Sequence, residues 1–265
     1  MNSLRSHSSD LVSEALLVSS ELIRVAILWL ETWHEGLEDA SRLYFGDGNV
    51  AGMLELLLPL HENIERGAMT ERENEFLKGF GDNLAQAHHH IKDYMQLTQL
   101  KLPNFPHATP ENPTFDPSEA GRVRRNEEAE DAMNKAWDIY YTVFRQINKQ
   151  LPSLTKLELS RCSPALTGAM NLELGVPGSY RVDGSYVKIH KFVPKVQVIT
   201  SKQRPRKITM RGSDGLDYVY LLKGHEDLRQ DERVMQLFGL VNALLARDPQ
   251  TKKYDLSIQR YAIAP

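Results

Sequence analysis

Hydrophobic residues in the first 150 positions recur at steps of three and four, which is the spacing of one face of an α-helix. One such pattern runs from about Leu22 to position 45 and a second covers 50–66, and each is followed by a glycine. A third begins after Thr70, where Glu73 three residues later completes a capping-box signature. These patterns predict three helices joined by short connections.

Residues 97–127 interrupt the helical pattern. Five prolines fall between Pro103 and Pro117, and the charged run that follows them has no apolar period. We therefore predict a disordered insertion at 97–127. Periodicity returns in "MNKAWDIYYTVFRQINKQL", which predicts a fourth helix at about 130–150. Four helices with mostly short connections predict an up-and-down bundle over 21–152.

After residue 152 the pattern changes to short runs that are rich in β-branched and aromatic residues. These runs are "YVKIHKF", "KVQVIT", "KITM" and "DYVYLL", and the "GSDG" between the last two is a hairpin signal. A long amphipathic pattern then predicts a helix at roughly 228–247, and "DLSIQRYAIAP" predicts one more strand. Residues 153–265 should therefore form a small antiparallel sheet with a helix, so the whole chain is a multi-domain α and α+β protein.

Composition narrows the class of protein only slightly. The 265 residues are 41% hydrophobic with a formal net charge of -3, which suits a globular protein and provides no overall field for nucleic acid. No apolar run reaches the roughly 18 residues of a membrane span. Cys162 is the single cysteine, so no intrachain disulfide can form. Histidines at 88–90 would point about 100° apart on a helix, and we predict no metal site.

The predicted fourth helix carries more aromatic residues than one interface can easily bury. Two stripes lie about 100° apart on its helical wheel: Ala136, Tyr140, Val143 and Ile147 on the one, and Trp137, Tyr141 and Phe144 on the other. Either the wide aromatic face packs against two neighbouring helices, or the second stripe lines an exposed groove for a ligand or a partner peptide. Periodicity alone leaves both interpretations open.

Two long segments resemble the FKBP–rapamycin-binding bundle of the target of rapamycin (TOR) kinases: "RVAILWLETWHEGLEDASRLYFGDGNVAGMLELLLPLHENIERG" and "KAWDIYYTVFRQINKQLPSLTKLELSRCSP". Residues 1–20 resemble the end of the helical repeat region that precedes that bundle. The resemblance implies a groove between the first and fourth helices that binds the FKBP–rapamycin complex and docks substrates. It implies these groove residues: Leu37, Ser41, Tyr44, Phe45, Asn134, Trp137, Asp138, Tyr141 and Phe144.

The chain departs from that family at two places. Asn134 stands where the family usually has a threonine on the groove wall, and its larger amide side chain bears on the affinity for the drug. The proline-rich insertion is also much longer than the family's short connection. Because the entropy of loop closure grows only logarithmically with length, we expect the insertion to be tolerated.

Lys223 ends the run "DYVYLL" and is followed closely by several acids. An ammonium group on a strand needs a partner if it is even partly buried. In a kinase small lobe, such a lysine neutralises the ATP phosphates, an acid of the next helix orients it, and a turn between the first two strands covers the phosphates. The alternative is a surface lysine beside a helix N-terminus, where acids are favourable in any case.

The strings "ITSKQRPRK" and "LLKGHEDLRQDERVMQLF" resemble the small lobe of phosphatidylinositol-3-kinase-related protein kinases. The resemblance implies that Lys223 binds the ATP phosphates, with Glu226 and Asp231 as its orienting acids. Ser201 would supply the hydroxyl of the phosphate turn, which lacks a G-x-G-x-x-G motif. The implied walls of the adenine pocket are Ile199, Pro205, Leu221 and Tyr261.

Two hypotheses follow. In the first, the chain is a segment of a TOR-type protein serine/threonine kinase that uses ATP and Mg²⁺ in nutrient and growth signalling. The catalytic loop and the Asp-Phe-Gly motif do not occur in the sequence, so we expect the Mg²⁺ ligands in the large lobe and little activity from these residues alone. In the second, the chain is a non-catalytic interaction protein with a docking bundle and a vestigial lobe.

The resemblance also implies partners and a location for the kinase. The expected partners are the FKBP–rapamycin complex, protein substrates and TOR complex subunits, with no nucleic acid and no transmembrane segment. The expected location is the cytoplasm, with peripheral association with endomembranes through partners.

Overall fold

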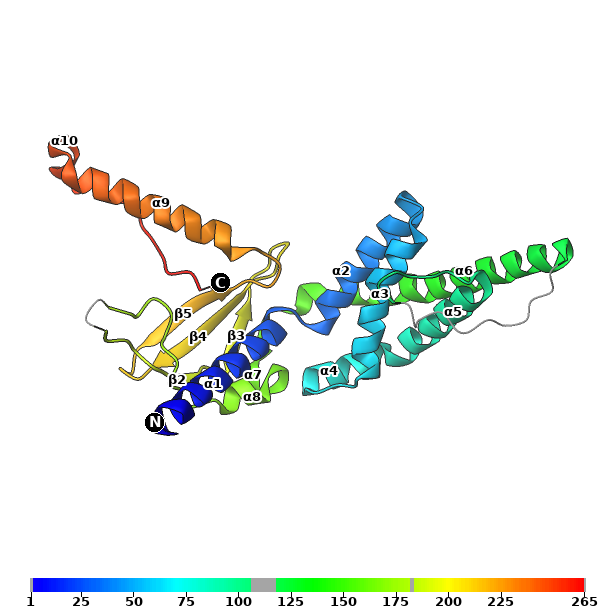
Figure 1. Cartoon of the computed structure of the whole chain (residues 1–265), viewed down its shortest axis with the longest axis horizontal. Coiled ribbons are helices and arrows are strands. Elements are labelled where there is room, and N and C mark those ends of the chain that lie inside the picture. Colours follow the sequence, from blue (N-terminus) through cyan, green and yellow to red (C-terminus); the bar gives the residue numbers. More distant parts are fainter. Residues whose placement is uncertain (1, 106–117, 182–183, 265) are drawn as a thin grey trace. The chain divides into compact units, whose positions relative to one another are not determined.

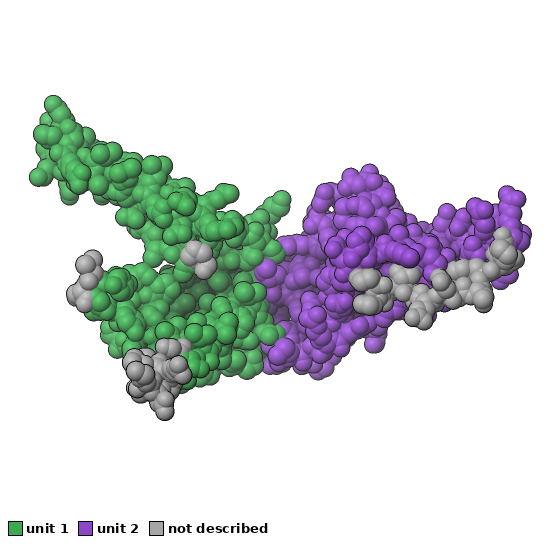
Figure 2. All heavy atoms as spheres, viewed as in Figure 1, with its two compact units in different colours: residues 1–26, 156–265 green, residues 27–155 purple. Residues whose placement is uncertain are grey.

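The computed structural model describes residues 2–105, 118–181 and 184–264. The chain forms two compact units (Figure 2). We call residues 27–155 the bundle unit, and we call residues 1–26 together with 156–265 the sheet unit.

The first helix, α1 (Asn2–Ala26), belongs to the sheet unit. This corrects the prediction of one uninterrupted helix from about Leu22, because α1 ends at Ala26 and the next helix begins at Trp29. The chain leaves helical geometry at Leu28, whose φ is -85° and ψ 156°. The Leu28 backbone N–H donates to the Glu31 carboxylate at 3.0 Å, which starts a new helix. Neither glycine nor proline marks this break, so the apolar period runs through it.

The bundle unit consists of long helices, two of which contain a π-helical turn (Figure 1). In chain order its elements are α2 (Trp29–Ser41), the π turn η1 (Arg42–Gly46), α3 (Val50–Glu65), α4 (Glu71–Phe76), the π turn η2 (Leu77–Gly81), α5 (Asp82–Thr98), α6 (Glu119–Gln150) and the short 3-10 helix η3 (Leu151–Ser153).

The predicted capping box is confirmed. The Glu73 N–H donates to Thr70 Oγ1 at 3.2 Å, and the Thr70 N–H donates to Glu73 Oε2 at 3.1 Å. Gly67 follows the end of α3 with φ +88°, a value that favours glycine. These local signals fix the connection between α3 and α4.

Helix α6 begins earlier than predicted, at Glu119. The Ser118 hydroxyl accepts the Gly121 N–H at 3.0 Å, and Arg124 pairs with Glu128 at 2.9 Å. The prediction of disorder at 97–127 is therefore wrong for 119–127, which are helical, and for 97–98, which lie in α5; residues 106–117 lie outside the described residues. A polar segment can remain helical here because the packed turns of α6 have already nucleated the helix.

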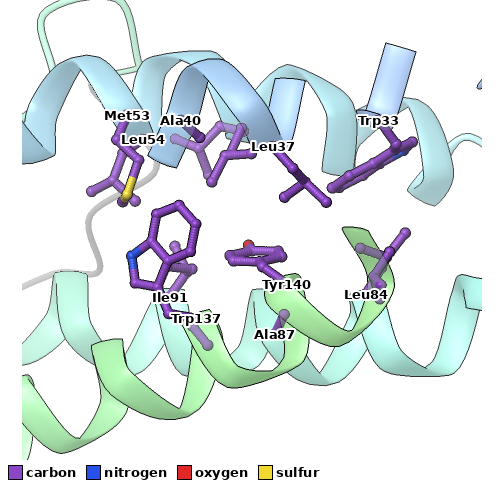
Figure 3. Close-up of a cluster of buried hydrophobic side chains, with 14 of the residues drawn as sticks. Trp33, Leu37, Ala40, Met53, Leu54, Leu84, Ala87, Ile91, Trp137 and Tyr140 are labelled. Carbon is purple, nitrogen blue, oxygen red and sulfur yellow. The ribbon is translucent and has the colours of Figure 1, made fainter. Parts of the chain in front are cut away.

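The core of the bundle unit lies where α2 and α3 face α5 and α6 (Figure 3). The first predicted stripe of α6 is fully part of this core, since Ala136, Tyr140, Val143 and Ile147 are all buried. The Tyr140 hydroxyl is 2.8 Å from His61 Nε2, so the phenol keeps a hydrogen-bond partner inside the core. Packing of this density makes large-to-small substitutions cost about 2–5 kcal/mol.

The sheet unit is built on one antiparallel sheet. Its strands are β1 (Lys156–Glu158), β2 (Ile189–Phe192), β3 (Lys195–Val198), β4 (Arg206–Gly212) and β5 (Asp217–Leu222). Strand β4 is central, because β3 and β2 pair with successive parts of one edge and β5 pairs along the other. The predicted hairpin is confirmed as β4 and β5, with Gly215 at φ +80° in its turn.

The remaining helices of the sheet unit are α7 (Leu159–Cys162), α8 (Pro164–Gly168), α9 (Leu228–Arg247) and α10 (Pro249–Lys252). Helix α9 has the predicted bounds, and Cys162 is buried. The strand predicted at "DLSIQRYAIAP" is wrong, because residues 255–264 are irregular. There the Asn242 side chain pairs with both backbone groups of Ile258, at 2.7 and 2.8 Å, in place of a strand partner.

Candidate functional site

A groove of about 380 Å³ lies on the bundle unit between α2 with η1 on one side and α6 on the other. Its lining residues are Leu37, Glu38, Ser41, Phe45, Trp137, Asp138, Tyr140, Tyr141 and Phe144. All the predicted groove residues line it except Tyr44 and Asn134. Sequence reasoning missed Glu38, which lies one residue after Leu37, and Tyr140, which the helical wheel assigned to the core alone.

The two exceptions lie next to the groove. The Tyr44 ring packs against Trp137, with ring centroids 5.4 Å apart, and against Phe45 at 4.8 Å, so it supports the aromatic wall from the side. Asn134 is exposed on α6, one turn before Asp138. A substitution at position 134 would therefore act on the edge of the groove.

The second aromatic stripe divides between core and surface. Trp137 is only 8% exposed and points from α6 toward the core residues of α2 and α3 (Figure 3), with the Phe45 ring centroid 5.0 Å away. Tyr141 is 61% exposed and Phe45 67% exposed. Phe144 stacks on His34 at 4.8 Å. The stripe therefore does not pack as one wide face against two helices, since its outer members form the wall of an open groove.

The chemistry of the groove suits an apolar ligand or side chain. Its base is aromatic and aliphatic, while the carboxylates of Glu38 and Asp138 and the hydroxyl of Ser41 provide its polar groups. An exposed apolar surface of this kind is typical of binding sites. The carboxylates favour a partner with hydrogen-bond donors or a positive charge around its apolar part.

In the sheet unit, Lys223 directly follows β5 and is bound by two carboxylates. Its Nζ donates to Glu226 Oε2 at 2.6 Å and to Asp231 Oδ2 at 3.2 Å. Asp231 lies in the first turn of α9, and the Asp227 side chain caps that helix by accepting the Arg229 N–H. Acids at this position are also favourable to the helix macrodipole. The structure thus brings together the predicted cation and both of its predicted acids.

The Lys223 ammonium remains charged in this environment. The hydrogen bond that Lys223 donates to Glu226 raises the pKa of Lys223 above its usual value, partial desolvation opposes this, and Asp231 raises it further. The Lys223 side chain is 24% exposed, so the ammonium can still be reached from solvent.

The other predicted ATP-site residues lie around the same end of the sheet or on its exposed surface. The turn 199–205 joins β3 to β4, and within it the Ile199 N–H donates to the Pro205 carbonyl oxygen at 2.9 Å. Ser201 belongs to this turn, and its carbonyl oxygen accepts the Arg204 N–H at 3.2 Å. Leu221 pairs with Lys207 of β4 and is exposed. Tyr261 is exposed in the irregular segment 255–264.

Among the residues that the structure describes, no group of three or more His, Cys, Asp or Glu side chains is arranged to bind a metal ion. The successive histidines have separate partners, since His88 pairs with Glu65 while His89 and His90 lie near Asp93. Within the described part of the chain, no helix combines the length and the apolar character needed to cross a membrane.

Two known protein families match separate parts of the chain. Residues 21–149 match the FKBP12-rapamycin binding domain, and residues 217–265 match the phosphatidylinositol 3- and 4-kinase family. The first match contains the groove, and the second contains β5, Lys223 and α9. The class is therefore a rapamycin-binding helical domain followed by part of a kinase domain of the phosphatidylinositol kinase type.

Similarity to individual proteins extends over the whole chain. The chain is 53% identical to serine/threonine-protein kinase TOR of Oryza sativa subsp. japonica and 49% identical to serine/threonine-protein kinase mTor of Drosophila melanogaster, in each case over 100% of the chain. Identity to serine/threonine-protein kinase TOR2 of Saccharomyces cerevisiae is 46% over 99% of the chain. The chain spans about a tenth of the length of these relatives. It belongs to the TOR family of serine/threonine-protein kinases.

Proposed function

We propose that this chain is the docking and ATP-phosphate-binding segment of a protein kinase that transfers the γ-phosphate of ATP to serine and threonine hydroxyls in nutrient and growth signalling. The observation that supports this most directly is the position of Lys223, an accessible ammonium at the end of β5 that two carboxylates orient. A charge fixed in this way is preorganised for a phosphate, because little side-chain freedom remains to be lost on binding.

The residues around Lys223 fit ATP. The alternation of side chains along β5 places Lys223 on the same sheet face as the exposed Val219 and Leu221, so apolar surface for an adenine adjoins a cation for phosphates. Ile199 and Pro205 of the turn and Tyr261 would complete the adenine walls, and Ser201 would contact a phosphate. ATP supplies the phosphoryl group, and Mg²⁺ offsets its charge. We place the Mg²⁺ ligands in the large lobe of the complete protein.

The groove of the bundle unit would bind the FKBP–rapamycin complex and dock protein substrates. Support comes from its aromatic wall, its exposed Phe45 and Tyr141, and the match of residues 21–149 to the FKBP12-rapamycin binding domain. The proposal also includes TOR complex subunits as partners and a cytoplasmic location with peripheral recruitment to endomembranes.

One experiment separates this proposal from the alternative of a non-catalytic interaction protein. The complete protein is incubated with radiolabelled ATP and a serine-containing peptide, and in parallel with a lysine-directed acyl-phosphate analogue of ATP. We expect phosphate transfer to the peptide, and labelling of Lys223 that excess ATP prevents. The interaction protein would bind FKBP–rapamycin in its groove but show neither transfer nor ATP-protected labelling, and that result would overturn the kinase proposal.

A further inference from the structure

Arg206, the first residue of β4, is a fully buried arginine at 0% exposure. The side-chain alternation along β4 places it on the same face as the buried Ile208 and Met210, opposite Lys207. It therefore lies on the reverse side of the sheet from the exposed Leu221, which pairs with Lys207. A buried guanidinium needs fixed hydrogen-bond acceptors, because desolvating an unsatisfied charge is expensive.

The Arg206 guanidinium bonds to the backbone of two separate segments. Its Nε donates to the Val25 carbonyl oxygen at 3.2 Å, at the C-terminal end of α1. Its Nη1 donates to the Arg204 carbonyl oxygen in the turn 199–205. The last carbonyls of a helix lack intrahelical donors and carry partial negative charge, so a cation there is doubly favourable. One side chain thus ties the end of α1 to the turn.

The register of the sheet places this connection directly behind the proposed phosphate site. Arg206 pairs with Val198, the last residue of β3, and with Leu222, the last residue of β5. The next residue after Val198 begins the turn, and the next after Leu222 is Lys223. The turn and the lysine therefore both start from the row of the sheet that Arg206 occupies.

The turn needs such support. Arg204 has φ +45°, a left-handed conformation that is unfavourable for a residue with a Cβ. The Arg204 N–H donates to the Ser201 carbonyl oxygen at 3.2 Å, so the conformation of Arg204 also sets the position of Ser201. The hydrogen bond from Arg206 to the Arg204 carbonyl stabilises that conformation from the α1 side.

We propose that Arg206 is a positioning residue for the phosphate turn: it places Ser201 and its neighbouring amides relative to Lys223 by bonding the turn to the end of α1. This inference rests on the proposed kinase function. It assigns to α1 a part in nucleotide affinity, since the Val25 carbonyl fixes the other side of the guanidinium.

The test uses the full-length protein and measures KM for ATP and kcat separately. Arg206→Met keeps an unbranched apolar side chain without the hydrogen bonds, and Arg206→Lys keeps the charge without the fork that reaches two carbonyls.

Arg211→Met, on the same strand but in an exposed pair with Asp217, is the matched control. We expect KM for ATP to rise on the order of tenfold in Arg206→Met and less in Arg206→Lys, which corresponds to losing a single charge-assisted hydrogen bond. The control should match the wild type, and kcat should change less than KM.

Amide hydrogen exchange separates positioning from general stability. In Arg206→Lys, exchange should increase in the peptide covering 199–205 and stay unchanged in α9 and in the bundle unit. Unchanged KM in both folded variants would overturn the inference, as would faster exchange throughout the sheet unit or failure of both variants to fold, either of which would make Arg206 a core residue only. If Lys223→Met also left ATP binding intact, the proposed function itself would fail, and this inference with it.

Discussion

The bundle unit and the sheet unit differ in how completely they cover their own apolar residues. In the bundle unit, the apolar stripes of α2, α3, α5 and α6 meet in one buried core. In the sheet unit, α9 buries Met235, whereas Val234, Leu237, Leu240 and Leu244 of the same helix are exposed. Both candidate sites lie where apolar side chains remain exposed, at the groove wall and on the outer face of β5.

Because of this difference, we expect substitutions in the two units to affect different properties. A change inside the bundle core alters stability first, because the buried residues of α6 pack against three other helices. A change at Lys223 alters chemistry first, because its partners are the accessible side chains of Glu226 and Asp231.

The largest effect is expected from Lys223→Met in the complete protein. Loss of a preorganised charge at the phosphates should lower the rate of phosphoryl transfer at least about 100-fold. The melting temperature of the bundle should stay the same, because Glu226 and Asp231, the partners of Lys223, belong to the sheet unit. Lys195→Met, at the exposed start of β3, is the matched control and should keep full activity. Near-normal kinase activity of the Lys223 variant would disprove the assignment.

The next effect concerns the groove. Ser41→Arg places a long cation among Leu37, Phe45 and Trp137, and it should weaken FKBP–rapamycin binding at least about tenfold by filling the site. Stability should change by no more than about 0.5 kcal/mol, because the groove is open to solvent.

The measurement is a binding titration, first on the wild type and on Asn134→Thr, and then on Ser41→Arg in the tighter binder of the two. Thr142→Arg, on the exposed face of α6 outside the groove lining, is the control and should bind normally. If the arginine at position 41 melts the bundle or leaves binding unchanged, the groove is not the binding site.

Acid should destabilise the bundle unit through a buried histidine pair. His61 stacks on His88 at 4.2 Å, and burial, with Lys92 nearby, lowers the pKa of His61 to about 2 and that of His88 to about 4. Both imidazoles stay neutral in the folded bundle well below pH 6.5, whereas in the unfolded chain they take up protons near pH 6.5. The free energy of unfolding is therefore fully maintained above pH 6.5 and decreases as the pH falls below it. At pH 5 the loss from His61 alone should be about 2 kcal/mol.

Urea unfolding at pH 7.5 and pH 5 measures this loss. In His61→Gln the difference in unfolding free energy between the two pH values should shrink by about 2 kcal/mol. In His89→Gln, where the imidazole is exposed and lies near Asp93, this difference should match the wild type. Equal pH dependence in all three proteins would show that the pair does not control acid stability.

The smallest effect is expected at the start of α6. Ser118→Ala removes the hydroxyl that accepts the Gly121 N–H and should destabilise the first turns by about 1 kcal/mol. Because these turns lie outside the core, faster hydrogen exchange should be confined to about 119–128, and Ser118→Thr should restore protection. Faster exchange along the whole of α6, or no change in exchange, would contradict the cap.

The sequence alone predicted an element correctly where the element depends on interactions between residues close in the chain. The capping box at Thr70, the hairpin turn at Gly215 and the amphipathic period of α9 each depend on residues close in the chain. The break at Leu28 was missed because it is made by a carboxylate that accepts a backbone N–H in an unbroken apolar run. A strand is predicted after residue 254 because apolar and polar residues alternate there. The structure has none at 255–264, where the Asn242 side chain bonds to the backbone of Ile258.

In the candidate sites too, contacts between residues close in the chain were predicted, and contacts between distant segments were not. The lysine and its acids lie within nine residues of one another, so sequence and family resemblance predicted a contact that the structure contains. The groove required α2 and α6 to meet, and the helical wheel could not show that Tyr140 reaches it while Tyr44 does not. Arg206 gave no signal at all, because its partners lie 181 residues away and in the neighbouring turn.

In the π turn η1, the number of residues matters as much for the groove as their identity. The Asp47 N–H donates to the Arg42 carbonyl oxygen at 3.1 Å, five residues back, so this turn contains one residue more than an α-helical turn. That extra residue rotates Tyr44 and Phe45 into contact with Trp137. Deleting a single residue from 42–46 would restore the α-helical phase and turn Phe45 away from the wall, even if every side chain of the groove were retained.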